Sequence, residues 1–177
     1  MFNRMSAATV VAALLLSGCG AWQSVSDAST NAYRAVFFKQ VKVLNVDLTA
    51  RASLNPDEAG RATSVAVRVY QLKDRKIFDE ATYDDLLKSD RTVLAPDLQA
   101  DMSTVVNPGA SSSLSQHMQP ETKYVAIVAL YRVPGAQGDW KRVIEKRKID
   151  PDKPLRMDLS LNGLQVAGEV AKSASSR

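Results

Sequence analysis

Few residues of this chain have the types and spacing that catalysis or metal binding needs. The single histidine, His117, lies in a polar stretch, whereas a zinc site or a Ser-His-Asp triad requires several partners close together. We therefore interpret His117 as a surface residue. Asp84 and Asp85 are adjacent carboxylates, but consecutive residues of a helix do not face one another, which favours a solvated helix face over an acid–base pair.

Gly135 and Gly138 come nearest to a phosphate-binding loop. Such a loop needs a basic residue and a following helix, and both are missing here, so the two glycines fit a hairpin turn. The sequence thus offers no active site. We expect a protein that is not an enzyme and that binds no metal or cofactor.

The one cysteine, Cys19, closes a segment with the layout of a bacterial export signal. The segment has a basic residue, Arg4, then an apolar stretch from Ala7 to Leu16, then small residues. The apolar stretch is shorter than the roughly 20 residues that span a bilayer as a helix. Because a lone cysteine makes no intrachain disulfide, the exported domain is expected to fold without one.

The residues Leu16-Ser17-Gly18-Cys19 resemble the lipobox of bacterial lipoproteins. The resemblance implies that the thiol of Cys19 receives a diacylglycerol and that residues 1–18 are removed as a signal peptide. It also implies that the new amino group is acylated, with palmitate as the expected chain. The alternative is a plain signal peptide with an incidental cysteine, or a buried N-terminal helix.

Gly20 follows the cysteine. In lipoproteins of enteric-type bacteria an aspartate at this position retains the protein in the inner membrane, so Gly20 implies the periplasmic face of the outer membrane. Several acyl chains on one residue anchor a protein stably. Outer-membrane lipid is therefore an expected partner.

The mature chain is long enough for one domain, and its charge excludes nucleic acid as a partner. Removing residues 1–18 leaves 159 residues and lowers the formal charge from +4 to +3. Charges of both signs are interspersed, with no basic block between aromatics.

We expect a lipidated tether with a short helix at 19–40, a domain at 41–165 and a loose tail at 166–177. Phe37 and Phe38 of the tether either pack on the domain or dip into the bilayer interface.

Hydrophobic periodicity predicts the elements of the first half of the domain. Residues from Val43 to Leu54 alternate between apolar and polar, which indicates a strand with one face on a core. Val65–Leu72 is the next strand and is apolar on both faces. We expect these two strands to pair across the long loop Asn55–Ser64. Between Asp74 and Asp90 the period becomes helical, which predicts one inserted helix.

Strands return in the second half, at Asp101–Val106, Ser111–Met118, Tyr124–Val133, Trp140–Ile149 and Leu155–Leu161. Of these, Tyr124–Val133 is apolar at nearly every position, which is typical of a central strand, whereas Trp140–Ile149 is charged like an exposed edge. About seven short strands with hairpin-like connections and one helix predict a mainly β fold, a two-sheet β-sandwich.

Several segments of the mature chain occur in an order that resembles a known family. They are the lipobox, the alternating first strand, Val67–Lys73 followed by Phe78 and Tyr83–Leu87, Asn107-Pro108-Gly109, Tyr124–Arg132 and Trp140-Lys141. Together, from about Val41 to Leu161, they resemble the outer-membrane lipoprotein of the type VI secretion system, the TssJ or SciN family. The resemblance implies a transthyretin-like β-sandwich with an additional helical element.

The resemblance also implies a structural role. Members of the family bind the periplasmic C-terminal domain of the large, TssM-like inner-membrane component and tie the membrane complex to the outer membrane. In the family, the loop between the first two strands carries partner contacts. Here that loop contains Asp57, Glu58 and Arg61 as charged residues, with Pro56 stiffening it. The resemblance alone distinguishes these candidate contact residues from an ordinary solvated loop.

Two alternative functions belong to other classes: a ligand-binding sandwich and an enzyme at the envelope. A periplasmic sandwich that binds a glycan or a small molecule needs a cluster of exposed aromatics, for which Trp22, Trp140 and a few tyrosines are available. A chaperone for a secretin is the nearest alternative within the binding class. An enzyme at the envelope lacks paired catalytic residues.

Overall fold

The computed structural model describes residues 40–136 and 139–168. The expected signal peptide, Cys19, the tether with Phe37 and Phe38, and Trp22 lie outside the described residues, as does the chain from residue 169 onward. From Val41 on, the described residues form one compact unit.

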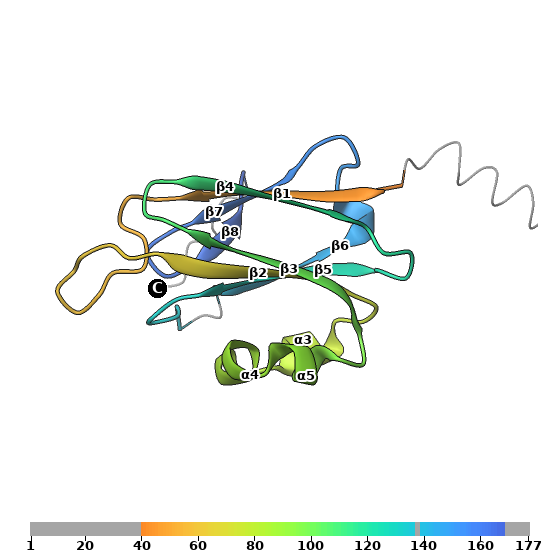
Figure 1. Cartoon of the computed structure of the whole chain (residues 1–177), viewed down its shortest axis with the longest axis horizontal. Coiled ribbons are helices and arrows are strands. Elements are labelled where there is room, and N and C mark those ends of the chain that lie inside the picture. Colours follow the sequence, from red (N-terminus) through yellow and green to blue (C-terminus); the bar gives the residue numbers. More distant parts are fainter. Residues whose placement is uncertain (1–39, 137–138, 169–177) are drawn as a thin grey trace, which may run out of the picture. The chain divides into compact units, whose positions relative to one another are not determined.

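Within the described residues, eight strands form two four-stranded sheets that face one another (Figure 1). The first sheet has the order β4-β1-β7-β8 and consists of Ser111–His117, Val43–Ala50, Leu155–Leu159 and Leu164–Val166. The second has the order β3-β2-β5-β6 and consists of Leu98–Val106, Val65–Leu72, Tyr124–Leu130 and Lys141–Glu145. The expected two-sheet β-sandwich is therefore confirmed.

The hydrophobic pattern explains which strands are covered on one face and which on both. In β1, Leu44, Val46 and Leu48 are fully buried, while Asn45 and the other alternate positions point away from the core. In β5, Val125 to Ala129 are all buried. Since β5 lies inside the second sheet and helices cover the outer face of that sheet, both faces of β5 are shielded from water.

The expected pairing of the first two strands is wrong. β1 pairs with β4 antiparallel and with β7 parallel, whereas β2 pairs with β3 and β5, so the two strands belong to different sheets. The alternation from Val43 to Leu54 is also misleading beyond Ala50. A turn follows there, with the Leu54 N–H donating to the Arg51 carbonyl at 3.1 Å. This turn carries the chain from one sheet to the other, and local periodicity does not report such a crossing.

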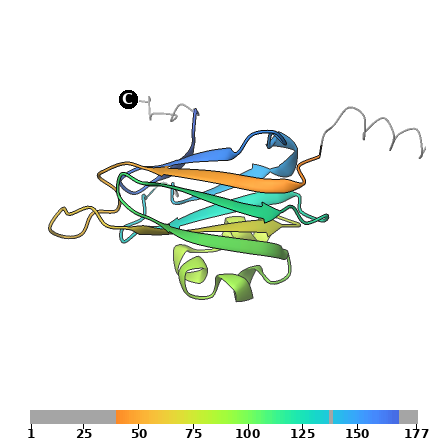
Figure 2. The same ribbon diagram turned by 45° about the horizontal axis from the view of Figure 1, so that its top comes forward.

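Three short helices replace the one expected helix: α3 (Lys76–Glu80), α4 (Tyr83–Lys88) and α5 (Asp90–Leu94). Ala81 is extended, and Thr82 caps α4 in a capping box with Asp85. The three helices cover the second sheet (Figure 2), and each has one fully buried side chain on its inner face: Phe78, Leu86 and Leu94. The acidic residues of α4 point outward as expected.

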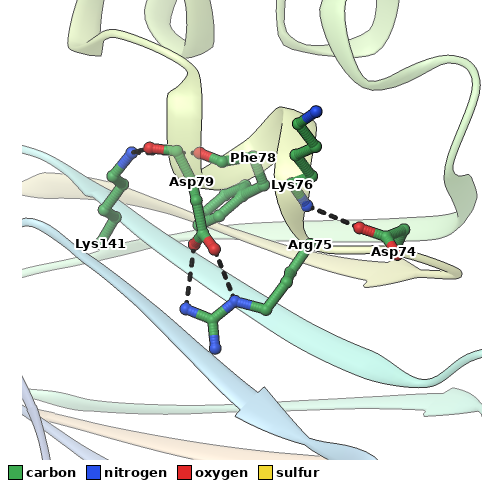
Figure 3. A network of polar contacts seen from close by, with 6 residues as sticks. All are labelled: Asp74, Arg75, Lys76, Phe78, Asp79 and Lys141. Carbon is green, nitrogen blue, oxygen red and sulfur yellow. Dashed lines mark hydrogen bonds and ion pairs between the residues drawn. The ribbon is translucent and has the colours of Figure 1, made fainter.

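Lys141 of β6 fastens these helices to the sheet (Figure 3). Its ammonium donates to the carbonyls of Phe78, Asp79 and Ala81 at 3.0, 2.8 and 3.0 Å. Carbonyls at the end of a helix have no partner within the helix, so a cation is well placed there. Trp140 is a core residue: it is 8% exposed and packs edge to face on Tyr83, with 4.9 Å between the ring centroids.

Several strand ends differ from the expected ones. β5 stops at Leu130 and β7 at Leu159. The charged return strand is the expected edge of its sheet, but it ends at Glu145 and continues as a 3₁₀ turn, η1 (Lys146–Lys148). No sequence pattern predicts β8, because three residues are too few to show a period.

Candidate functional site

Connecting segments from four parts of the chain meet at one end of the sandwich, where β1 ends and β2 begins. They comprise residues 51–64, 107–110, 131–136 and 160–163, and we call this the loop end. The segment between β1 and β2 is the longest and extends beyond the strands, at the left in Figure 1. This segment contains the candidate partner-binding residues Pro56, Asp57, Glu58 and Arg61.

A buried asparagine, Asn55, holds the loop end together and is only 4% exposed. Its Nδ2 donates to the Ser64 carbonyl at 2.7 Å, and its Oδ1 accepts from the Arg132 N–H at 2.7 Å. The Asn55 N–H donates to the Leu161 carbonyl at 2.9 Å. One residue thus joins three connecting segments.

Asn55 also has a φ of 44°, in the left-handed region that asparagine tolerates better than most residues. A signal for this conformation is present in the sequence, since Asn-Pro is a turn dipeptide. What a sequence does not show is that the side chain points inward and binds the backbone of segments far away along the chain.

Tyr131 fixes a further part of the loop end. Its hydroxyl donates to the Gly163 carbonyl at 2.6 Å, and the residue is 2% exposed. Burial raises the pKa of the Tyr131 hydroxyl well above its ordinary value, so it stays a hydrogen-bond donor. These hydrogen bonds form a frame at the base of the loop end, from which the tip of the segment 51–64, residues 57–61, extends.

The tip is itself ordered by an aspartate. Asp57 Oδ1 accepts from the N–H groups of Ala59 and Arg61 at 3.0 and 2.9 Å, and Oδ2 pairs with the Arg61 guanidinium at 2.8 Å. Gly60 has a φ of 75°, which this tight turn requires. The hydrogen bond from the Arg61 backbone is the main cause that holds the pKa of Asp57 below its ordinary value.

The four candidate residues are thus brought together, but they are not equivalent. Both carboxylate oxygens of Asp57 accept hydrogen bonds within the loop. The Arg61 side chain is 81% exposed and has further donors for another molecule. Glu58 is exposed and Pro56 is half-buried at the base of the tip. Arg61 and Glu58 are consequently the charged groups that the tip offers to a partner.

Exposed apolar side chains lie at the same end of the sandwich as this segment. Among the described residues, the three most exposed large hydrophobic side chains are Val133, Val105 and Leu161, with 72%, 62% and 48% of their surface accessible. All three lie at the loop end: Leu161 follows β7, Val133 follows β5, and Val105 pairs with Ala66 at the start of β2. We call them the apolar rim. No sequence pattern locates this rim, because its members come from three separate segments.

The other candidate residues have structural surroundings. His117 is exposed, Asp84 pairs with Lys88 at 2.7 Å, and Asp85 caps its own helix. Within residues 40–136 and 139–168, histidine, cysteine and carboxylate side chains form no group of three that could hold a metal ion. None of the helices in these ranges is long and apolar enough to cross a membrane.

Known proteins match the domain in sequence and in fold. The model of the family described as "Type VI secretion lipoprotein, VasD, EvfM, TssJ" matches residues 42–163. A chain of the solved structure named "Type VI membrane complex" is 33% identical, covers 72% of this chain and 98% of its own length, and has a TM-score of 0.68. No curated protein sequence matches.

Two further solved structures are similar. A chain in the structure named for the C-terminal domain of the type VI secretion protein TssM from EAEC is 29% identical, covers 71% of this chain and 98% of its own, and has a TM-score of 0.64. The lipoprotein TssJ1 from Pseudomonas aeruginosa is 24% identical over 71% of this chain and 95% of its own, with a TM-score of 0.58. The last similarity concerns the fold alone and agrees with the β-sandwich described above.

Proposed function

The chain belongs to the type VI secretion lipoprotein family, and from this premise we propose that it docks an inner-membrane component of the secretion apparatus to the outer membrane. The partner in this proposal is the periplasmic C-terminal domain of a TssM-like protein. A similar chain occurs in a solved structure that is named for this domain of TssM, which supports the choice of partner.

The observation that carries the proposal is the composition of the loop end. Its three exposed apolar side chains lie at the same end as a loop whose base is joined by Asn55 and whose tip is ordered by Asp57. Apolar contacts that become buried supply most of the affinity of an interface, while charges such as Glu58 and Arg61 set its register and rate of association. A rigid tip also lowers the entropy lost on binding.

We propose that the second attachment is the lipid on Cys19. Several acyl chains on this residue would hold the protein in the inner leaflet of the outer membrane. Changing Cys19→Ser should release the protein from the outer-membrane fraction and abolish incorporation of labelled palmitate. A variant that stays in that fraction and still takes up palmitate would contradict the anchor.

The docking claim is tested by titrating the unlipidated chain, starting at Gly20, with the periplasmic C-terminal domain of the TssM-like partner. A second titration uses a chain in which residues 57–61 are replaced by a Gly-Ser turn, while Asn55 and Ser64 are kept because they form the frame. We expect binding by the unchanged chain and a loss of at least about tenfold in affinity for the replacement, with an unchanged thermal melt. A well-folded chain that does not bind the domain would refute the proposal.

A further inference from the structure

The opposite end of the sandwich has a different charge. It is the end where β1 begins at Val43 and β7 begins at Leu155, and we call it the tether end. The register of the parallel pair, Val46 beside Leu155, places both strand starts together. Outside the helical insertion 73–97, basic residues outnumber acidic ones there: the cations are Lys42, Lys123, Lys146, Arg147, Lys148, Lys153 and Arg156, and the acids are Asp47, which lies beside Arg156, Glu121, Glu145, Asp150 and Asp152.

At the loop end, by contrast, charges of the two signs nearly balance. The cations there are Arg51, Arg61, Arg132, Lys141 and Arg142, and the acids are Asp57, Glu58, Asp139 and Asp158. The excess of cations over acids is therefore larger at the tether end. The two ends lie on opposite sides in Figure 1, with the start of β1 at the right of the sandwich and the long loop at the left.

A groove lies within the tether end and gathers three of its cations. It has a volume of about 460 Å³ and is lined by Lys148, Lys153 and Arg156, with apolar walls from Leu155 and Val166. One acid, Asp150, lines it too and pairs with Lys153 at 3.3 Å. Lys148 pairs with Glu145 at 3.3 Å. Both lysines are exposed, with 67% and 78% of their side chains accessible, and ion pairs of exposed lysines are weak, so both can exchange their partners for another anion.

The chain enters the domain at this same end. The compact unit starts at Val41, and β1 begins two residues later. A lipid on Cys19 would reach the domain through the segment 20–40, so covalent connection keeps the tether end within reach of the bilayer surface. An anionic surface close to a cluster of basic side chains attracts them strongly at short range.

We propose that the cationic groove binds the headgroup phosphates of anionic phospholipids. With the tether end against the membrane, the loop end, at the other end of the strands, would point into the periplasm toward its partner. The inference rests on the proposed lipid anchor. It adds to that anchor a surface that orients the domain, with Lys148, Lys153 and Arg156 as phosphate donors.

The test uses the unlipidated chain starting at Gly20, which keeps the whole compact unit and its core. Flotation measures its binding to phosphatidylethanolamine vesicles with and without phosphatidylglycerol, at low ionic strength. The groove variant combines Lys148→Gln, Lys153→Gln and Arg156→Gln. The matched control combines Arg51→Gln, Arg61→Gln and Arg132→Gln, which removes the same charge from the loop end.

We expect the unchanged chain to bind only the vesicles that contain phosphatidylglycerol. The groove variant should lose at least about tenfold in affinity, since each basic residue near an anionic surface contributes several-fold, while the control should retain most of its binding. Equal losses in both variants would mean that net charge alone drives binding and would overturn the proposal. So would a failure of the folded, unchanged chain to prefer the anionic vesicles. Because neither measurement involves Cys19 or the partner domain, the proposed function stands or falls separately.

Discussion

The loop end and the tether end of the sandwich are made from opposite ends of the same strands, yet they are stabilised and charged differently. The loop end has a buried amide, Asn55, at its centre, nearly balanced charges and an apolar rim. The tether end has a basic 3₁₀ turn and a cationic groove. Because the two ends are formed by different connecting segments, each end can carry side chains that suit a separate partner. The apolar rim suits another protein, and the cationic groove suits an anionic surface.

The largest expected effect concerns the frame of the loop end. Asn55→Ala removes two side-chain hydrogen bonds of 2.7 Å each. It also places alanine, which tolerates the left-handed region less well than asparagine, at a φ of 44°. We expect the free energy of unfolding to fall by about 3 kcal/mol, from unpaired buried backbone groups and strain together. Chemical denaturation measures it.

Asn162→Ala is the matched control, because Asn162 lies at the same end and is exposed. It should change stability by less than about 0.5 kcal/mol. Asn55→Gly separates the two causes, since glycine accepts the left-handed conformation and should recover about 1 kcal/mol of the loss. Equal stability of the Asn55→Ala and Asn162→Ala variants would contradict the role given to Asn55.

The helices provide a third region that belongs to neither end. Lys141→Met keeps a long apolar side chain but removes the ammonium, and with it the three hydrogen bonds to carbonyls and the cation–π contacts with the rings of Phe78 and Trp140. We expect a loss of about 2 kcal/mol in the free energy of unfolding and faster amide exchange in α3. Binding to the partner domain and to vesicles should not change. A change in either would show that the helices take part in one of the two surfaces.

The apolar rim is expected to have a smaller effect, on affinity and not on stability. Val133→Ser combined with Leu161→Ser should weaken binding to the partner domain by about tenfold, since apolar contact area is lost. Leu87→Ser is the control, because Leu87 is 39% exposed on α4 and away from the loop end. Isothermal titration compares the three chains. Equal affinities for the double variant and the unchanged chain would exclude the rim from the interface.

The smallest effect concerns pH. Hydrogen bonds from Arg61 and Ala59 hold the pKa of Asp57 below its ordinary value. The ionised carboxylate therefore keeps the tip ordered at pH values above the ordinary aspartate pKa. That order should be lost as the pH falls through the lowered pKa in the folded protein. Amide shifts of Ala59 and Arg61 followed by NMR report it. Asp57→Asn should abolish this titration, and Glu58→Gln should leave it intact; a titration that persists in Asp57→Asn would assign it elsewhere.

Local patterns predict the elements that depend on local causes. β2 runs from Val65 to Leu72 as expected, and the helical period correctly marks a helical insertion, though Ala81 and Thr82 divide it. The sandwich follows from the number and length of the strands. The family resemblance is confirmed by the match over residues 42–163.

What the sequence does not predict depends on contacts between distant segments. Which strands pair is decided by the packing of two sheets, so alternation in β1 says nothing about its partners β4 and β7. The apolar rim and the groove each collect side chains from several connecting segments. Asn55 carries a turn signal, yet its inward direction follows from the Ser64, Arg132 and Leu161 backbone around it.

The central claim is that the two ends act separately and at the same time. The most direct measurement is co-flotation of the TssM-like periplasmic domain with the chain already bound to vesicles containing phosphatidylglycerol. If the loop end binds the partner while the tether end binds lipid, the partner domain should float with the vesicles, and its affinity for the chain should equal the affinity in solution. If the partner domain instead displaces the chain from the vesicles, one surface serves both, and the account is contradicted.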